Sequence, residues 1–321
     1  MKALIIKLTS MGDLMHALPA LTEAGKNISN LQVDWVVDEN FSDIPSWHPN
    51  IKEIITTNHR SWKKQIFSSS SRKALYELKK KINYNNYDVV VDMQNNLKSA
   101  FISYLYKGKV HGLDRSSVRE YPAHWSYSNY SKVSKNLHAI ERQKILLSDA
   151  LGYEYIEEDF DYGINKSKFI KPNIELPSKY AVLVHNASWP SKIWLVTYWQ
   201  ELIKYFESKG ISTLLPSGNK EELLIAKKIS KNSTKSIALN LMPLNNIGYI
   251  LDNAEICVCS DTGLAHLSAV VNTPSITLYG PTDVNLIGTK GKNQRHLIGN
   301  DNSITNILPN DVIKLIEEIN I

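Results

Sequence analysis

Short apolar segments typical of β-strands alternate with helical patterns along most of this chain. We expect strands at residues 2–7, 33–37, 52–56, 87–93 and 109–113, and again at 180–186, 211–216, 236–239, 255–260 and 274–279. Helical patterns recur between several of these strands, at residues 14–25, 75–83, 197–208, 220–229 and 263–271. Such alternation is typical of parallel sheets covered by helices on both faces. The sequence therefore predicts an α/β fold.

The alternation is interrupted once, between residues 152 and 178. This stretch holds an acidic run at 157–161 followed by Lys168, Lys171 and Pro172, a composition that indicates a linker or hinge. A chain of 321 residues is long for one hydrophobic core and comfortable for two. We therefore expect two doubly wound domains, 1–160 and 161–321, that face each other across a cleft. The last helix, expected near 309–319, could pack back on the first domain.

Composition and charge narrow the class of protein without identifying a partner. Hydrophobic residues make up 43% of the chain and charged residues 21%, which is ordinary for a globular protein. The net charge of +5 favours an anionic partner, but the basic residues are scattered and no nucleic-acid-binding motif appears, so we expect no nucleic acid. The N-terminus lacks a signal-peptide pattern, and no apolar run reaches the roughly 18 residues of a membrane span. We expect a cytoplasmic protein.

Several common cofactor motifs are missing. The first strand-to-helix turn, residues 8–13, holds one glycine rather than Gly-x-Gly-x-x-Gly, and no P-loop appears, which argues against a dinucleotide oxidoreductase and an NTPase. Cys257 and Cys259 stand two apart on one expected strand, as small buried core residues rather than a metal or redox motif. No His, Cys and Asp cluster has the spacing of metal ligands, so we expect no metal.

The segment 256–271 predicts an anion site. An apolar strand ends at Asp261, and Thr262 then stands where a helix should begin, a position that threonine often caps. Gly263 allows close approach of a ligand to the backbone, and His266 projects from the same face as Thr262. The N–H groups of a first helical turn, together with the helix dipole, can bind a phosphate. The alternative interpretation is an ordinary strand–turn–helix without a ligand.

The N-terminal segment carries a second candidate. The strand at 2–7 is followed by Asp13 and then by Leu14, Leu18 and Leu21 at helical spacing. Asp13 therefore stands at a strand-to-helix turn, where open α/β sheets place their chemistry. Aspartate also serves often as a helix N-cap, and the two roles are compatible.

Together these motifs resemble the heptosyltransferases of glycosyltransferase family 9. The resemblance rests on Ser-Met-Gly-Asp at 10–13, His16, Leu-Pro-Ala-Leu at 18–21, Lys-Ile-Trp at 192–194, Asp-Thr-Gly-Leu-Ala-His at 261–266 and Tyr-Gly-Pro-Thr-Asp at 279–283. Asp-x-Gly-x-x-His alone is weakly specific, whereas the ordered set is specific, and its spacing fits the family along the whole chain.

The resemblance implies a GT-B fold and an inverting glycosyltransferase of lipopolysaccharide core biosynthesis in Gram-negative bacteria. It implies ADP-L-glycero-D-manno-heptose as donor and the inner Kdo of Kdo-lipid A as acceptor, with Asp13 as general base. No metal is needed where a helix N-terminus and Lys192 take up the charge of the leaving diphosphate. Alternatives of the same fold are a heptosyltransferase that adds a later heptose and a nucleotide-sugar epimerase. A two-lobed sugar-binding protein is an alternative of another class.

The resemblance also implies the residues of the donor site. Asp261 and His266 match residues that contact the donor sugar or phosphates, while Lys192 and the N–H groups of Thr262 and Gly263 would hold the diphosphate. Glu222 matches the acid that holds the ribose hydroxyls, and Met242 matches an adenine contact. The chain departs from the family in having Ala187-Ser188 where paired threonines are common, and Leu195 where proline follows the tryptophan. Ser188 can still supply one hydroxyl.

Basic residues are the candidates for the acceptor site. A basic and aromatic loop, 59–67, contains Arg60 and Lys64, and a second basic set consists of Arg115, Arg119 and Arg142. We expect Arg60, Lys64, Arg119 and Arg142 to contact the anionic acceptor. We expect the loop to meet an anionic membrane surface, with the enzyme peripheral on the cytoplasmic face of the inner membrane. The alternatives are a solvated surface loop and ordinary surface ion pairs.

Overall fold

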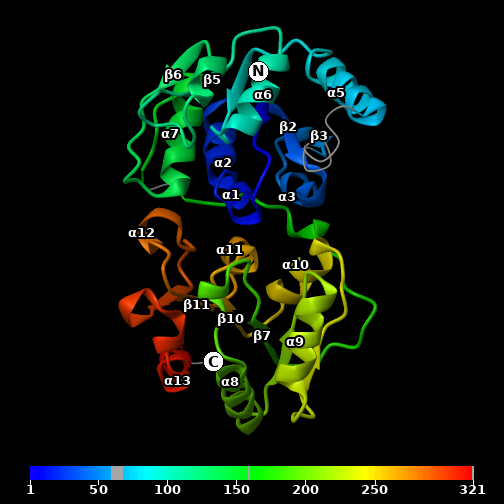
Figure 1. Ribbon diagram of the computed structural model, residues 1–321, viewed down its shortest axis with the longest axis vertical. Helices are drawn as coiled ribbons and strands as arrows, with labels where there is room; N and C mark the ends of the chain where they lie inside the picture. Colours follow the sequence, from blue (N-terminus) through cyan, green and yellow to red (C-terminus); the bar gives the residue numbers. More distant parts are fainter. Residues whose placement is uncertain (59–67, 158–159, 320–321) are drawn as a thin grey trace. The chain divides into compact units, whose positions relative to one another are not determined.

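The computed structural model describes residues 1–58, 68–157 and 160–319, and the chain divides into two compact units (Figure 1). Unit 1 comprises Met1–Asn165 and unit 2 comprises Lys166–Ile321. The division falls within the stretch of 152–178 that the composition marked as a linker, five residues after the expected boundary at 160.

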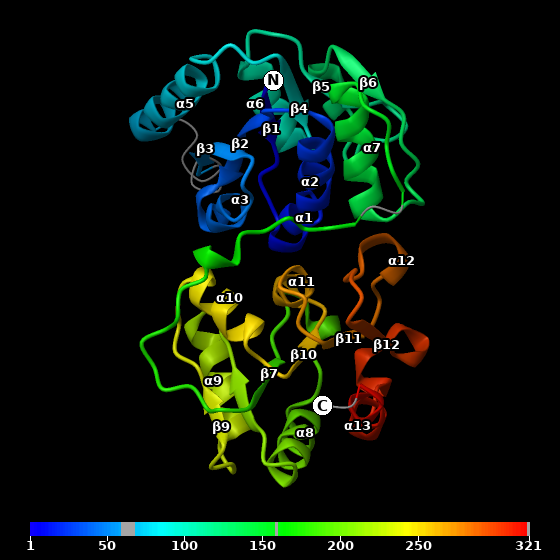
Figure 2. The same cartoon turned by 180° about the vertical axis from the view of Figure 1, so that it is seen from behind.

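Unit 1 is built on a six-stranded parallel sheet. Its strands are β1 (Lys2–Ile6), β2 (Gln32–Asp38), β3 (Ile51–Thr57), β4 (Val89–Asp92), β5 (His111–Leu113) and β6 (Asn129–Ser131), in the order β3-β2-β1-β4-β5-β6. Its helices are α1 (Met11–Met15), α2 (Leu18–Asn27), α3 (Asp43–Ser46), α5 (Ser69–Ile82), α6 (Leu97–Leu105) and α7 (Ala139–Leu151), with short 3-10 turns η1 (Glu39–Phe41) and η2 (Ala123–Ser126). Figures 1 and 2, seen from opposite sides, show α6 on one face of the sheet and α2 beside α7 on the other.

Unit 2 repeats this topology. Its strands are β7 (Tyr180–Val184), β8 (Ser212–Leu215), β9 (Ser236–Ala238), β10 (Ile256–Ser260), β11 (Ser275–Tyr279) and β12 (Gln294–Ile298), parallel and in the order β12-β11-β10-β7-β8-β9. Its helices are α8 (Val196–Ser208), α9 (Lys220–Ser230), α10 (Leu244–Asp252), α11 (Gly263–Val270), α12 (Val284–Ile287) and α13 (Pro309–Glu318), with 3-10 turns η3 (Lys166–Lys168), η4 (Pro190–Lys192), η5 (Asn300–Asn302) and η6 (Ile304–Asn306). The predicted pair of doubly wound parallel sheets is confirmed.

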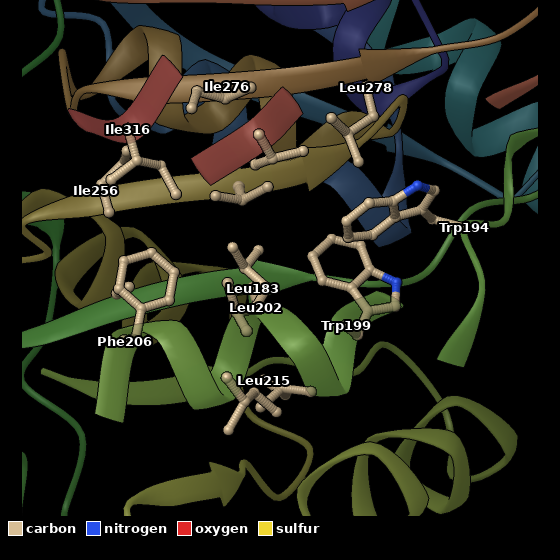
Figure 3. Close-up of a cluster of buried hydrophobic side chains, with 14 of the residues drawn as sticks. Leu183, Trp194, Trp199, Leu202, Phe206, Leu215, Ile256, Ile276, Leu278 and Ile316 are labelled. Carbon is tan, nitrogen blue, oxygen red and sulfur yellow. The ribbon is translucent and has the colours of Figure 1, made fainter. Parts of the chain in front are cut away.

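The core of unit 2 explains where the last helix goes. Val312 and Ile316 of α13 are buried in the same hydrophobic cluster as Trp199 and Phe206 of α8 (Figure 3). The buried side chains of α13 therefore belong to the core of unit 2. Packing of this helix on the first domain stays a prediction. No helix in the described part of the chain combines the length and the apolar character that crossing a bilayer requires.

The strand order places the candidate sites. In each sheet the first strand of the unit lies beside the fourth: β1 pairs with β4, and β7 pairs with β10. Chain connections leave these two strands in opposite directions, and ligands of doubly wound sheets bind beyond the carboxyl ends of such a pair. The loops that follow β1 and β4, and those that follow β7 and β10, are therefore the places to look for function.

Candidate functional site

The turn after β1 holds a carboxylate in a network of donors. Asp13 lies in α1, and its Oδ2 accepts hydrogen bonds from the backbone N–H of Ser10 at 3.0 Å and from the Ser10 hydroxyl at 3.1 Å. Arg119, which follows β5, donates from Nη1 to the same oxygen at 3.2 Å. The side chain of Asp13 keeps 26% of its surface exposed. A carboxylate that is held in place and still open to solvent can take a proton from a bound hydroxyl.

Charges around Asp13 favour its ionised form. Burial by itself would raise its pKa, but the charges of Lys7 and Arg119, together with the N–H of Ser10, outweigh burial and hold the pKa of Asp13 below its usual value. Lys7 is buried at the end of β1, where its Nζ donates to the carbonyl of Met93 at 3.0 Å. Burial lowers the pKa of Lys7 to about 8, although the charge of Asp13 opposes that shift.

Two predicted arginines, Arg119 and Arg142, lie near each other, and Arg119 contacts Asp13. Arg142, in α7, donates from Nη2 to the carbonyl of Ser117 at 2.7 Å. Burial and the nearby charge of Arg119 lower the pKa of Arg142. The neighbouring guanidinium groups of Arg119 and Arg142 concentrate positive charge in this part of unit 1, which suits an anionic ligand. Arg60 and Lys64, the other predicted acceptor contacts, lie outside the described residues.

The loop after β4 contributes residues that the sequence did not indicate. Asp92 is fully buried, and its Oδ1 accepts the N–H groups of Gln94 and Asn95, both at 2.9 Å. Gln94 in turn accepts the N–H groups of Leu8 at 3.0 Å and Thr9 at 3.1 Å through its Oε1. The carbonyl of Asn95 accepts the N–H of Arg119 at 3.0 Å. This loop therefore holds both the turn that carries Asp13 and the arginine that contacts it.

We expect Gln94→Ala to lower the free energy of unfolding of unit 1 by about 1–3 kcal/mol, because the buried N–H of Leu8 and that of Thr9 lose their acceptor. The measurement is urea unfolding followed by tryptophan fluorescence. The matched control is Gln200→Ala, since Gln200 of α8 is partly exposed and donates only to the carbonyl of Lys228 in the described structure. Equal stability of the two variants would mean that Gln94 does not hold the turn.

In unit 2, Lys192 and Asp261 form an ion pair. Lys192 ends the 3-10 turn η4 after β7, Asp261 directly follows β10, and Lys192 Nζ lies 2.6 Å from Asp261 Oδ2. The side chain of Lys192 is 20% exposed and that of Asp261 is 8% exposed. The hydroxyl of Thr282, after β11, donates to the same carboxylate oxygen. The predicted residues therefore meet at the carboxyl ends of the central strands.

Trp194 explains why the lysine is held there. Its ring is buried and packs edge-to-face on Trp199, with ring centroids 4.9 Å apart (Figure 3). Its Nε1 donates to the carbonyl of Ile307 at 2.8 Å. Tryptophan burial of this kind contributes both apolar area and a satisfied polar group. It fixes the backbone two residues beyond Lys192, so that the ammonium faces Asp261.

The helix that follows β10 begins as the sequence predicts. Thr262 is the N-cap residue of α11 with extended backbone angles, and its side chain makes no capping hydrogen bond. Gly263 is the first helical residue, and His266 lies one turn on and is buried. The N–H groups of a first turn have no partner within the helix, so they are free to bind an anion beside Lys192.

Three other predicted donor residues follow neighbouring strands at the same sheet edge. Glu222 is in the first turn of α9 after β8, where its carboxylate accepts the N–H of Gly218 at 2.7 Å and the side-chain amide of Asn219 at 2.8 Å. Met242 is half-buried between β9 and α10, and Ser188 is exposed after β7. Because carboxyl ends of parallel strands share one edge, these residues lie on the side of the sheet that carries Asp261.

The two sites differ in the chemistry they can perform. Unit 1 offers a carboxylate held in its ionised form among cations, which suits proton abstraction near an anion. Unit 2 offers an ammonium and a helix N-terminus, which suit a diphosphate. Within the described ranges, no group of three or more His, Cys, Asp or Glu side chains could hold a metal ion.

Sequence reasoning missed Lys7, Gln94 and Thr282. A charged residue at the end of an apolar strand was a possible signal for Lys7. Thr282 lies in the Tyr-Gly-Pro-Thr-Asp motif, but the motif does not reveal that its hydroxyl reaches Asp261. Gln94 carries no local signal, because its role depends on residues 85 and 86 positions away.

Comparison with known proteins places the chain among sugar transferases. Residues 75–309 match glycosyltransferase family 9 (heptosyltransferase). Lipopolysaccharide heptosyltransferase 1 of an Escherichia coli strain is 36% identical over 320 residues, which cover 99% of this chain and 98% of that protein. The protein of the same name from Salmonella typhimurium is 37% identical over 96% of this chain and 97% of its own length.

Solved structures agree with the sequence comparison. The structure of E. coli heptosyltransferase WaaC with ADP superposes with a TM-score of 0.93 at 36% identity and covers 99% of this chain and 100% of that one. E. coli heptosyltransferase II, at 18% identity and a TM-score of 0.80, shares the fold, as does a UDP-GlcNAc 2-epimerase from Methanocaldococcus jannaschii at 16% and 0.50. The family match over residues 75–309 and the relatives of 36–37% identity along nearly the whole chain agree, and the chain belongs to glycosyltransferase family 9, the heptosyltransferases.

Proposed function

We propose that this chain is a lipopolysaccharide heptosyltransferase I, which transfers L-glycero-D-manno-heptose from ADP-heptose to the inner Kdo of Kdo-lipid A with inversion at the anomeric carbon. The observation that carries the proposal is the 36% identity over 99% of the chain to lipopolysaccharide heptosyltransferase 1. A relative of equal identity was solved with ADP and also with ADP-2-deoxy-2-fluoro heptose, which supports the same donor here.

The donor half of the reaction belongs to unit 2. As the bond between the anomeric carbon and ADP breaks, negative charge grows on the diphosphate. The ammonium of Lys192 and the N–H groups of Thr262 and Gly263 can stabilise that charge. Asp261 keeps Lys192 in position at 2.6 Å. We assign Asp261 and His266 to the donor sugar or phosphates, Ser188 to a further hydroxyl contact, Glu222 to the ribose and Met242 to the adenine.

The acceptor half belongs to unit 1. Asp13 takes the proton of the acceptor hydroxyl while that oxygen attacks the anomeric carbon on the side opposite the leaving diphosphate. Arg119 and Arg142 supply positive charge for the Kdo carboxylates or the lipid A phosphates, and we assign Arg60 and Lys64 to the same anions. Because lipid A is anchored in a bilayer, we propose that the enzyme works peripherally on the anionic cytoplasmic face of the inner membrane.

The pH dependence of the reaction follows from the charges around Asp13. Arg119 helps to lower the pKa of Asp13, so the base stays ionised at pH values where an ordinary aspartate would be protonated. Arg119→Gln removes that charge and raises the pKa. We therefore expect the acidic limb of the pH profile of kcat/KM to lie at a higher pH in Arg119→Gln than in the wild type. An acidic limb that coincides with that of the wild type would contradict this electrostatic role.

One experiment tests the proposed function and its alternatives together. The purified protein is incubated with ADP-heptose and Kdo-lipid A, and the acceptor is examined by mass spectrometry for the addition of one heptose. Transfer only to an acceptor that already carries heptose would identify an enzyme of a later step. Conversion of the nucleotide sugar without acceptor would identify an epimerase, and binding without any reaction would identify a sugar-binding protein.

A further inference from the structure

Helix α6 presents apolar side chains to solvent. Leu97, Phe101 and Tyr104 recur at helical spacing on one face, and they are 50%, 47% and 79% exposed. The opposite face of the helix, with Ala100, Ile102 and Ser103, is buried against the sheet. An amphipathic helix normally exposes polar residues on its outer side, so an apolar outer face indicates a contact that the isolated chain does not show.

The turn η2 and the residues before it extend this apolar face. Tyr121 is 56% exposed and Trp125 is 71% exposed, and their rings meet edge-to-face with centroids 5.9 Å apart. Helix α6 packs against η2, and the N–H of Leu97 donates to the carboxylate of Glu120 at 3.0 Å, which joins the two segments. We call Leu97, Phe101, Tyr104, Tyr121 and Trp125 together the α6–η2 surface.

Basic residues are frequent in the part of the chain that forms the α6–η2 surface. Between residues 97 and 135 the chain has seven Lys and Arg residues against two acids, an excess equal to the net charge of +5 of the whole chain. Lys98, Lys107 and Arg115 of this set are exposed, and the Arg115 guanidinium lies over the ring of Tyr121, 5.4 Å from its centroid. Both acids already accept hydrogen bonds, Asp114 from Ser116 and Ser117 and Glu120 from Leu97.

We propose that the α6–η2 surface docks unit 1 on an anionic lipid bilayer. Tyrosine and tryptophan favour the interface between headgroups and acyl chains, and lysine and arginine beside them are attracted by anionic lipids. The charge excess selects an anionic surface over a neutral one. This inference rests on the proposed function, whose acceptor is held in a membrane, and it names a docking surface made of residues other than those of the loop 59–67.

Docking through the α6–η2 surface would also affect catalysis, because this surface is close in sequence to Arg119. Arg119, which contacts Asp13, stands between Arg115 and Tyr121 in the same loop. Tyr121 and Trp125, the proposed bilayer contacts, are therefore close in sequence to Arg119, which contacts the proposed base. Docking would raise the local concentration of a membrane-held acceptor at Asp13 without any change in the chemical step.

The test measures binding of the full chain to vesicles of phosphatidylethanolamine and phosphatidylglycerol, without substrates. We expect the double variant Tyr104→Ser with Trp125→Ser, and separately Lys98→Glu with Lys107→Glu, to bind at least about tenfold more weakly. High salt should weaken binding of the wild type, and vesicles of phosphatidylcholine alone should bind it poorly. The control is Ile298→Ser, since Ile298 is 59% exposed but lies in unit 2.

Two further measurements test whether the bilayer itself contacts the surface. Brominated lipids should quench the fluorescence of the wild type more than that of Trp125→Phe, because Trp125 would lie at the interface. Transfer to a water-soluble Kdo acceptor without acyl chains should keep its kcat/KM in the double variant, whereas transfer to vesicle-held acceptor should fall. If no acceptor is glycosylated, the proposed function fails, but vesicle binding still tests the surface.

Unchanged vesicle binding by the aromatic double variant would overturn the proposal. Sedimentation velocity tests the alternative occupant of this surface, a second copy of the chain. If the wild type is a dimer and the double variant is a monomer that binds vesicles as well as the wild type does, the surface is a contact between two copies of the chain.

Discussion

Asp13→Asn should lower the rate of heptose transfer by about 10²–10⁴-fold, the usual contribution of a positioned general base. The amide has nearly the size and shape of the carboxylate, and its oxygen can still accept a hydrogen bond from Ser10 or Arg119. It cannot take the proton of the acceptor hydroxyl. The fall should therefore appear in kcat, measured with saturating ADP-heptose and acceptor.

Binding of ADP distinguishes loss of a base from loss of structure. Asp13 lies in unit 1, and the proposed diphosphate contacts lie in unit 2, so calorimetry should show the same affinity for ADP in Asp13→Asn and the wild type. Asp43→Asn is the matched control, because Asp43 is a half-buried carboxylate in α3 of the same unit without a role in the proposed mechanism. Near-normal turnover of Asp13→Asn would remove Asp13 from the reaction.

Most of the fold could be predicted from the sequence because buried parallel strands are continuous apolar runs. The strands β1, β2, β7, β10 and β11 are buried along nearly their whole length and match the predicted segments. The edge strands β6 and β12 were missed. Residues 129–131 read Asn-Tyr-Ser and residues 294–298 read Gln-Arg-His-Leu-Ile, and both are partly exposed, so neither has the apolar content that marks a strand.

In the candidate sites too, local sequence patterns predict some residues, whereas contacts between residues far apart in the sequence could not be predicted. Asp13, Asp261 and the start of α11 each stand where a strand gives way to a helix, a boundary that local pattern reveals. The contact of Arg119 with Asp13 joins residues 106 positions apart, and that of Lys7 with Met93 joins residues 86 positions apart. Such contacts depend on the strand order β1-β4-β5, which no local pattern specifies. The acceptor site was therefore predicted only as a set of basic residues.

The second large effect is expected when the ion pair between Lys192 and Asp261 is broken, and it concerns the affinity for ADP. Lys192→Ala removes an ammonium that would bind the diphosphate, and it also leaves the buried carboxylate of Asp261 without its cation. Hydrogen bonds to charged groups contribute about 1.5–3 kcal/mol, so we expect ADP to bind roughly 10–100-fold more weakly. Calorimetric titration with ADP measures the change.

The two contributions can be separated with a double variant. Asp261→Asn removes the carboxylate charge, so Lys192→Ala combined with Asp261→Asn should recover part of the affinity if the uncompensated charge of Asp261 repels the diphosphate. Lys209→Ala is the control, because the pair of Lys209 with Glu317 spans 3.8 Å and its side chains are 53% and 55% exposed. Unchanged affinity of Lys192→Ala for ADP would refute the assigned role of Lys192, and a preference of the wild type for UDP over ADP would refute ADP-heptose as the donor.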